Sequence, residues 1–152
     1  MKFRIYTDTS VIGGVFDKEF EEWSKQLIDK FINGQDTIVI SDLTLREIEE
    51  APKKVRDIIE KIPKKYREYV TLNDEARVLA NHYLEENVIT QKYLIDAQHI
   101  AIATINKVDV VVSWNFQHIV NLNKIKLYNG VNLKYGYSLI EIRSPREIIY
   151  EK

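Results

Sequence analysis

Short continuous apolar runs alternate along the chain with stretches whose apolar residues recur every three or four positions. The runs predict β-strands at residues 3–7, 37–41, 108–113 and 137–142. Uninterrupted apolar character is typical of strands that are buried on both faces of a parallel sheet. The pattern therefore favours a mostly parallel sheet over an antiparallel one.

Helices are predicted between these strands. In residues 17–33 the apolar side chains Phe20, Trp23, Leu27 and Phe31 share one face, and Asn33-Gly34 is a typical helix end. Four more helical segments are predicted at 43–50 behind a cap at Ser41 or Asp42, at 52–63 between two prolines, at 73–87 behind Asn73, and at 92–106, with helical turns over 115–133.

Strands that alternate with helices predict an α/β fold, here a three-layer sandwich with a central, mostly parallel sheet flanked by helices. No internal repeat, linker or low-complexity tract interrupts the chain. We therefore expect a single domain over residues 1–152.

Composition excludes several classes of function. Lys and Arg number 22 and Asp and Glu 23, so the whole molecule has no charge that favours nucleic acid. A local basic flank remains possible, although such helical side chains are usually just solvated: Lys53, Lys54, Arg56, Lys61, Lys64, Lys65 and Arg67. The absence of cysteine excludes disulfides and thiolate metal sites. Without an apolar stretch of roughly 20 residues, we expect a cytoplasmic protein with no membrane partner.

The strand ends sort the acidic residues into two groups. In an open parallel sheet, sites form beyond the carboxyl ends of the strands. Asp8 follows the first strand, Glu47 lies in the helix after the second, and Asn115 follows the third. Asp36 and Asp109 precede their strands, so they are expected at the opposite edge, away from any site.

Asp96 is unusual because it lies on a very apolar helix, "KYLIDAQHIAIATIN". A buried carboxylate is costly unless it is paired or binds a metal. A salt bridge to Lys92, four residues earlier, is the alternative, although Lys before Asp is the weaker order on a helix.

Plainer interpretations exist for the other residues. Asp8 could cap a turn, Glu47 could lie on a solvated helix face, and Asn115 could cap the following helix. His99 and His118 are isolated and more often represent surface or partly buried polar groups than ligands. Together, however, carboxylates from distant positions at one strand edge suit Mg²⁺ or Mn²⁺. Such ions orient water and neutralise phosphate charge in phosphodiester cleavage.

Four motifs in order along nearly the whole chain resemble the PIN domain, and in particular the nucleases of VapC-type toxin–antitoxin systems. These motifs are "DTS" after the first strand, "SDLTLREI" at the second, "DAQHIAIA", and "SWNF" after the third. Asp8, Glu47 and Asp96 match the three acidic positions that hold the metal. Asn115 replaces the aspartate found in many members at a fourth position. Supporting hydroxyls fall at Thr9, Ser10 and Ser113.

The resemblance implies a PIN-like sandwich and a Mg²⁺- or Mn²⁺-dependent endoribonuclease that cleaves single-stranded RNA. It also implies a homodimer, which the many aromatic residues independently favour, and a small antitoxin as partner. Asn115 leaves open the number of metals and the alternative of a catalytically weak RNA- or protein-binding module. A Mg²⁺-dependent phosphatase is a second alternative, but Ser10 occupies the position where such an enzyme needs a second aspartate.

Overall fold

The structure is a computed structural model that describes residues 1–150; residues 151 and 152, the end of the expected domain, lie outside it. Within this range five strands form one parallel sheet in the order β3-β2-β1-β4-β5. The strands are β1 (Arg4–Thr7), β2 (Thr37–Ser41), β3 (Arg67–Val70), β4 (Val110–Val112) and β5 (Ile142–Arg143).

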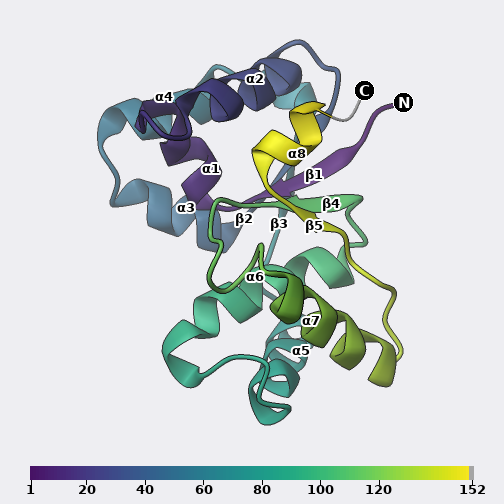
Figure 1. Cartoon of the computed structure of the whole chain (residues 1–152). Coiled ribbons are helices and arrows are strands. Elements are labelled where there is room, and N and C mark those ends of the chain that lie inside the picture. The colour runs from purple at the N-terminus through teal and green to yellow at the C-terminus, as the bar shows by residue number, and fades with distance from the viewer. Residues whose placement is uncertain (151–152) are drawn as a thin grey trace.

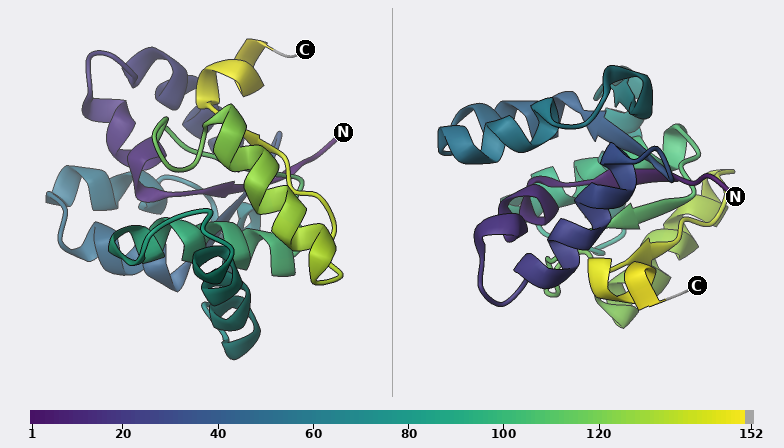
Figure 2. Two further views of the ribbon diagram at one scale, coloured as in Figure 1. Left: turned by 60° about the horizontal axis from the view of Figure 1, so that its bottom comes forward. Right: turned by 90° about the horizontal axis from the view of Figure 1, so that it is seen from above.

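Helices cover both faces of the sheet (Figure 1). One layer contains α5 (Asp74–Glu85), α6 (Leu94–Ile105) and α7 (Leu122–Lys134). The other layer contains α1 (Thr9–Gly13), α2 (Glu21–Ile32), α4 (Lys53–Glu60) and α8 (Pro145–Tyr150), while α3 (Asp42–Glu49) follows β2 and contributes to both cores. Turned views show the same three layers, with the N-terminus and α8 on one side of the molecule (Figure 2).

Two apolar cores result from the alternation of side chains along each strand. Tyr6, Val39 and Val111 point into the core beneath α5, α6 and α7. Their neighbours Ile5, Ile38 and Val110 point into the core beneath α1, α2 and α4. Because both faces of the strands are covered, their sequences read as continuous apolar runs. The predicted three-layer α/β fold with a parallel sheet is confirmed.

Several predicted boundaries were wrong. The last strand is not at 137–142 but at Ile142–Arg143, and the residues before it form a connection. The strand β3 was missed because its four residues, "REYV", carry two charges and lie at the sheet edge. The helix predicted from residue 17 begins at Glu21, and the turns predicted from 115 become a helix only at Leu122.

The predicted caps were better founded. Ser41 accepts a hydrogen bond from the Thr44 amide at 3.2 Å and begins α3, and Asn73 accepts one from the Ala76 amide at 2.9 Å and begins α5. Gly34 ends the region of α2 with φ of +73°, which favours glycine. Over residues 1–150, none of the helices combines the length and the apolar character needed to cross a bilayer.

Candidate metal and nuclease site

Asp8 directly follows β1 and is the N-terminal cap of α1, at the carboxyl edge of the sheet. Its side chain is only 6% exposed, and it caps α1 by accepting a long hydrogen bond, 3.4 Å, from the Val11 amide. The plain interpretation of Asp8 as a cap is therefore correct, but it does not account for the rest of the carboxylate's surroundings.

Two serine hydroxyls hold the Asp8 carboxylate, one on each oxygen. Ser10 Oγ lies 2.6 Å from Oδ1 and Ser113 Oγ lies 2.6 Å from Oδ2. Each hydroxyl also accepts a hydrogen bond from a backbone amide. The Trp114 amide donates to Ser10 Oγ at 2.9 Å, and the Asn115 amide donates to Ser113 Oγ at 2.9 Å. Because these amides occupy a lone pair of each hydroxyl, its single proton is directed to the carboxylate. A residue of α1 and the residue that follows β4 thus fix the orientation of Asp8.

Burial nevertheless raises the pKa of Asp8, against the opposing effects of His99 and the hydrogen bonds from Ser10 and Ser113. A carboxylate whose negative charge is disfavoured at this position would gain from a nearby cation. Among the described residues, no Lys or Arg forms an ion pair with Asp8.

Asp96 lies in the first turn of α6. This helix leads back to the start of β4, so its own beginning lies at the carboxyl edge of the sheet. Burial raises the pKa of Asp96, and the negative charges of Asp8 and Glu47 raise it further, whereas His99 and His118 oppose the rise. Asp8 and Glu47 therefore lie within electrostatic range of Asp96. The alternative salt bridge to Lys92 does not form among residues 1–150.

Glu47 lies on α3, and its side chain is 45% exposed. Its Oε1 atom lies 3.2 Å from His99 Nε2 and accepts a hydrogen bond from Thr9 Oγ1 at 3.1 Å. The contact with His99 is the main reason that the pKa of Glu47 is lowered. Its carboxylate is therefore ionised, and it is the most accessible of the three acids.

His99 was not predicted as a site residue, yet it is only 2% exposed and connects the site to the core. Its Nδ1 atom lies 2.6 Å from the Tyr6 hydroxyl, which also donates to Ser41 Oγ at 2.8 Å. A signal was present in the sequence, because His99 follows Asp96 by three residues and shares its helix face. Tyr6 likewise precedes Asp8 by two residues and shares its strand face.

Asn115 lies beside this group but uses its side chain locally. Its Oδ1 atom accepts hydrogen bonds from the amides of Gln117 at 3.2 Å and His118 at 2.9 Å. The structure thus favours the interpretation of Asn115 as a cap of the following turn.

Asp42 follows β2 at the same edge of the sheet. It accepts a hydrogen bond from the Leu72 amide at 3.0 Å, which connects α3 to the segment after β3.

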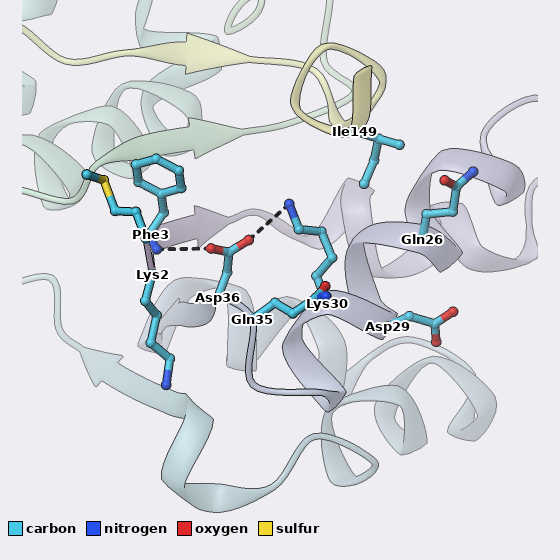
Figure 3. A pocket seen from close by; sticks show the side chains of 9 residues that line it. Lys2, Phe3, Gln26, Asp29, Lys30, Gln35, Asp36 and Ile149 are labelled. Carbon is cyan, nitrogen blue, oxygen red and sulfur yellow. Dashed lines mark hydrogen bonds and ion pairs between the residues drawn. The ribbon is translucent and has the colours of Figure 1, made fainter. Parts of the chain in front are cut away.

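The opposite edge of the sheet holds Asp36 and Asp109, as predicted. Asp109 accepts the Arg4 amide at 2.7 Å, and Asp36 accepts the Phe3 amide at 2.9 Å. Figure 3 shows Asp36 with its ion-pair partner Lys30 in the wall of a pocket of about 790 Å³. The volume of this pocket suits a small ligand, but Asp36 is already paired with Lys30, so size alone does not identify the functional edge.

The acids at the carboxyl edge do not form a ready-made cage. Within residues 1–150, no group of three or more His, Asp or Glu side chains is arranged to hold a metal ion as it stands. The oxygen donors themselves suit a hard divalent cation. Asp8 is fixed by its hydroxyls, so closure around an ion would depend on the more exposed Glu47 and on Asp96.

Comparison with known proteins identifies the fold. Neither a protein-family model nor a curated protein matches the sequence. Solved structures do match. VapC20 from Mycobacterium tuberculosis, a sarcin–ricin loop cleaving toxin, has a TM-score of 0.57 at 11% identity over 74% of this chain and 91% of its own. The chain has a PIN-domain, VapC-like fold.

Two further solved structures extend this similarity over most of the chain. VapBC2 from Rickettsia felis, bound to a DNA fragment from its promoter, has a TM-score of 0.56 at 12% identity and covers 93% of this chain and 98% of its own. FitAcB from Neisseria gonorrhoeae has a TM-score of 0.59 at 12% identity with the same coverage, 93% and 98%. At such identities the PIN-domain, VapC-like likeness concerns the fold, and the chemistry has to be argued from the site.

Proposed function

We propose that this PIN-like protein is a Mg²⁺- or Mn²⁺-dependent endoribonuclease that cleaves single-stranded RNA and acts as the toxin of a toxin–antitoxin pair. One observation carries the proposal. Asp8 and Asp96 are two neighbouring acids with raised pKa values at the carboxyl edge, and Glu47 adds a third negative charge. Among the described residues, no Lys or Arg forms an ion pair with any of them.

The three acids fit a hard cation by the chemistry of their donors. Like charges that destabilise one another without an ion become favourable ligands with one. When bound, the ion activates water and neutralises charge on the phosphodiester. Asp8, Glu47 and Asp96 would hold it.

The surrounding residues have defined supporting roles in this proposal. Ser10 and Ser113 keep both oxygens of Asp8 in one orientation through bonds of 2.6 Å. Tyr6 and His99 connect Glu47 to the buried side of β1, so that the carboxylate is poised at the edge of the site. Thr9 donates to the same Glu47 oxygen and links it to α1. These contacts reduce the reorganisation required when the site closes.

The proteins with similar folds support the proposed substrate and partner. The neighbours include a sarcin–ricin loop cleaving toxin and the VapBC2 and FitAcB structures, which supports an RNA substrate and a small antitoxin protein.

We further propose a homodimer, because several large apolar side chains are exposed on and around α7: Phe116, Leu122, Leu127, Leu133 and Leu139. Light scattering at micromolar concentration tests this, and a monomeric mass would contradict it.

The decisive experiment is cleavage of labelled single-stranded RNA and of a sarcin–ricin loop oligonucleotide by the purified protein. Cleavage is expected with Mn²⁺ or Mg²⁺, and its loss is expected with EDTA and in Asp8→Asn. The matched control is Asp109→Asn, which changes a carboxylate at the opposite edge. Cleavage that persists in EDTA, or that Asp8→Asn leaves intact, would contradict the proposal.

A catalytically weak binding module is the second candidate. It is favoured by Asn115, which places an amide where many PIN domains have a fourth acid and which already uses its Oδ1 atom on two backbone amides. Metal-independent binding of RNA or of a partner protein, without cleavage under any divalent ion, would support this candidate.

A further inference from the structure

His118 is an imidazole without a partner next to the proposed metal site. Both of its ring nitrogens are buried, and neither has a hydrogen-bond partner among the described residues. The ring lies against Tyr93 with 3.7 Å between the ring centroids, and the His118 carbonyl accepts a hydrogen bond from Tyr128 at 2.9 Å. The backbone and one face of the ring are therefore held, while the nitrogens are not.

A buried imidazole of this kind requires an explanation. A neutral ring carries one donor and one acceptor nitrogen, and nearly all such groups in folded proteins are paired with protein, water or an ion. His99 shows the usual situation, because its two nitrogens contact Tyr6 and Glu47. His118 is thus the imidazole near the acids that retains a free nitrogen lone pair.

The packing of the His118 ring and electrostatic interactions place His118 near Asp96. Tyr93 precedes the first turn of α6, in which Asp96 lies. Asp96 interacts electrostatically both with His118 and with Tyr128, whose hydroxyl holds the His118 carbonyl. His118 and Asp96 do not form an ion pair within 4 Å. An unpaired carboxylate and an unpaired imidazole therefore lie close together without contacting each other.

We propose that His118 is a further ligand of the cation held at Asp96, and that its nitrogen makes the site prefer Mn²⁺ over Mg²⁺. This inference rests on the proposed function, since it needs the cation at the three acids. An ion between the two side chains would engage the orphaned lone pair and the carboxylate together. Mg²⁺ demands near-ideal octahedral geometry and usually keeps waters, whereas imidazole suits first-row transition metals better.

The first measurement is pulsed electron paramagnetic resonance of Mn²⁺ bound to the wild-type protein. Modulation from an imidazole ¹⁴N is expected, and it should disappear in His118→Phe, which keeps a ring against Tyr93. His82→Phe is the matched control, because His82 also stacks on a tyrosine, Tyr135, at 3.7 Å and has an Nδ1 atom without a hydrogen bond. That variant should retain the modulation.

Calorimetric titration supplies the second measurement. His118→Phe is expected to weaken Mn²⁺ binding by about 10-fold, the lower end of the loss seen when a group that supports a metal is removed. Mg²⁺ binding should change little. The preference for Mn²⁺ should therefore shrink in this variant and remain in His82→Phe.

The outcomes separate this inference from the proposed function. If Mn²⁺ binds to the wild type and Asp96→Asn abolishes binding, but no ¹⁴N modulation appears, the acids hold the ion and His118 does not. Modulation that survives His118→Phe and disappears in a His99 variant would likewise overturn the assignment. If Mn²⁺ does not bind to the wild type, or binds equally to Asp96→Asn, the proposed metal site itself is wrong.

Discussion

The two edges of the sheet use acidic residues in opposite ways. At the amino edge, Asp36 and Asp109 accept backbone amides that fix the start of β1, and Asp36 also pairs with Lys30 at 3.2 Å (Figure 3). Glu68 accepts a hydrogen bond from Arg4 Nε at 2.9 Å, and this contact lowers the pKa of Glu68. Each of these three acids therefore has a backbone donor or a cation as its partner.

At the carboxyl edge, burial disfavours the charged forms of Asp8 and Asp96. Asp8 and Asp96 have raised pKa values, and the negative charges of Asp8 and Glu47 contribute to the rise for Asp96. Natural proteins keep such unfavourable groups mainly where function requires them. The difference teaches that the electrostatic cost of charged acids, rather than their number or the size of a nearby pocket, distinguishes a stabilising edge from the candidate functional one.

The largest expected effect separates the two edges by activity. Asp8→Asn is expected to reduce metal-dependent RNA cleavage by more than about 100-fold, because even groups that only support a metal ligand are worth about 10- to 100-fold. The Asp109→Asn variant should cleave RNA at the wild-type rate. Initial rates of the two variants, matched for folding by circular dichroism, make the test. Equal losses in both would break the comparison.

Asp36→Ala is expected to lower stability and not activity, which is the reverse of the effect expected for Asp8→Asn. The substitution leaves the Phe3 amide and Lys30 without their partner, and we expect a loss of about 1–3 kcal/mol in the free energy of unfolding. Denaturant titration measures this loss. Cleavage per folded molecule should be unchanged. If the variant instead kept full stability and lost cleavage, Asp36 would belong with the functional acids and not with the stabilising ones.

Asp96→Asn should stabilise the metal-free protein. The pKa of Asp96 is raised in the folded state, so the folded protein loses stability as the pH rises from the unfolded value of about 3.9 to the folded one. At neutral pH the Asp96→Asn variant carries no charge at this position, so it does not suffer this loss of stability. A gain on the order of 1 kcal/mol raises Tm by about 2–4 °C in a chain of this size.

Calorimetry at pH 7 in EDTA tests the sign of this change. The wild type, but not Asp96→Asn, should then gain stability when Mn²⁺ is added. A variant less stable than the wild type in EDTA would show that Asp96 is paired after all, like the acids at the amino edge.

The smallest expected effect concerns Asn115. An aspartate there can keep one oxygen on the Gln117 and His118 amides and adds a negative charge beside the acids. Asn115→Asp is therefore expected to tighten Mn²⁺ binding by a few-fold. Equal dissociation constants for the two proteins, measured by titration calorimetry, would show that Asn115 serves only as a cap.

Much of the fold could be predicted because its signals are local. The runs at β1, β2 and β4 are apolar on both faces, and Ser41 and Asn73 cap helices through hydrogen bonds that reach only three residues along the chain. The rule that sites form at the carboxyl ends of parallel strands then separated Asp8 from Asp36 and Asp109. By contrast, β3 and β5 are short edge strands, and pairing with β2 and β4 makes them strands.

The sequence by itself determined which strand ends carry acids and which residue types could hold a divalent ion. Only the tertiary structure decided which side chains have partners. Asp8 and Ser113 are 105 positions apart, and the hydrogen bond between them exists because β1 and β4 are neighbours in the sheet. The engagement of His99 and the isolation of His118 depend in the same way on what packs against each ring. Pairing over such distances has no local signal, because it is set by sheet order and by the packing of helices on the sheet.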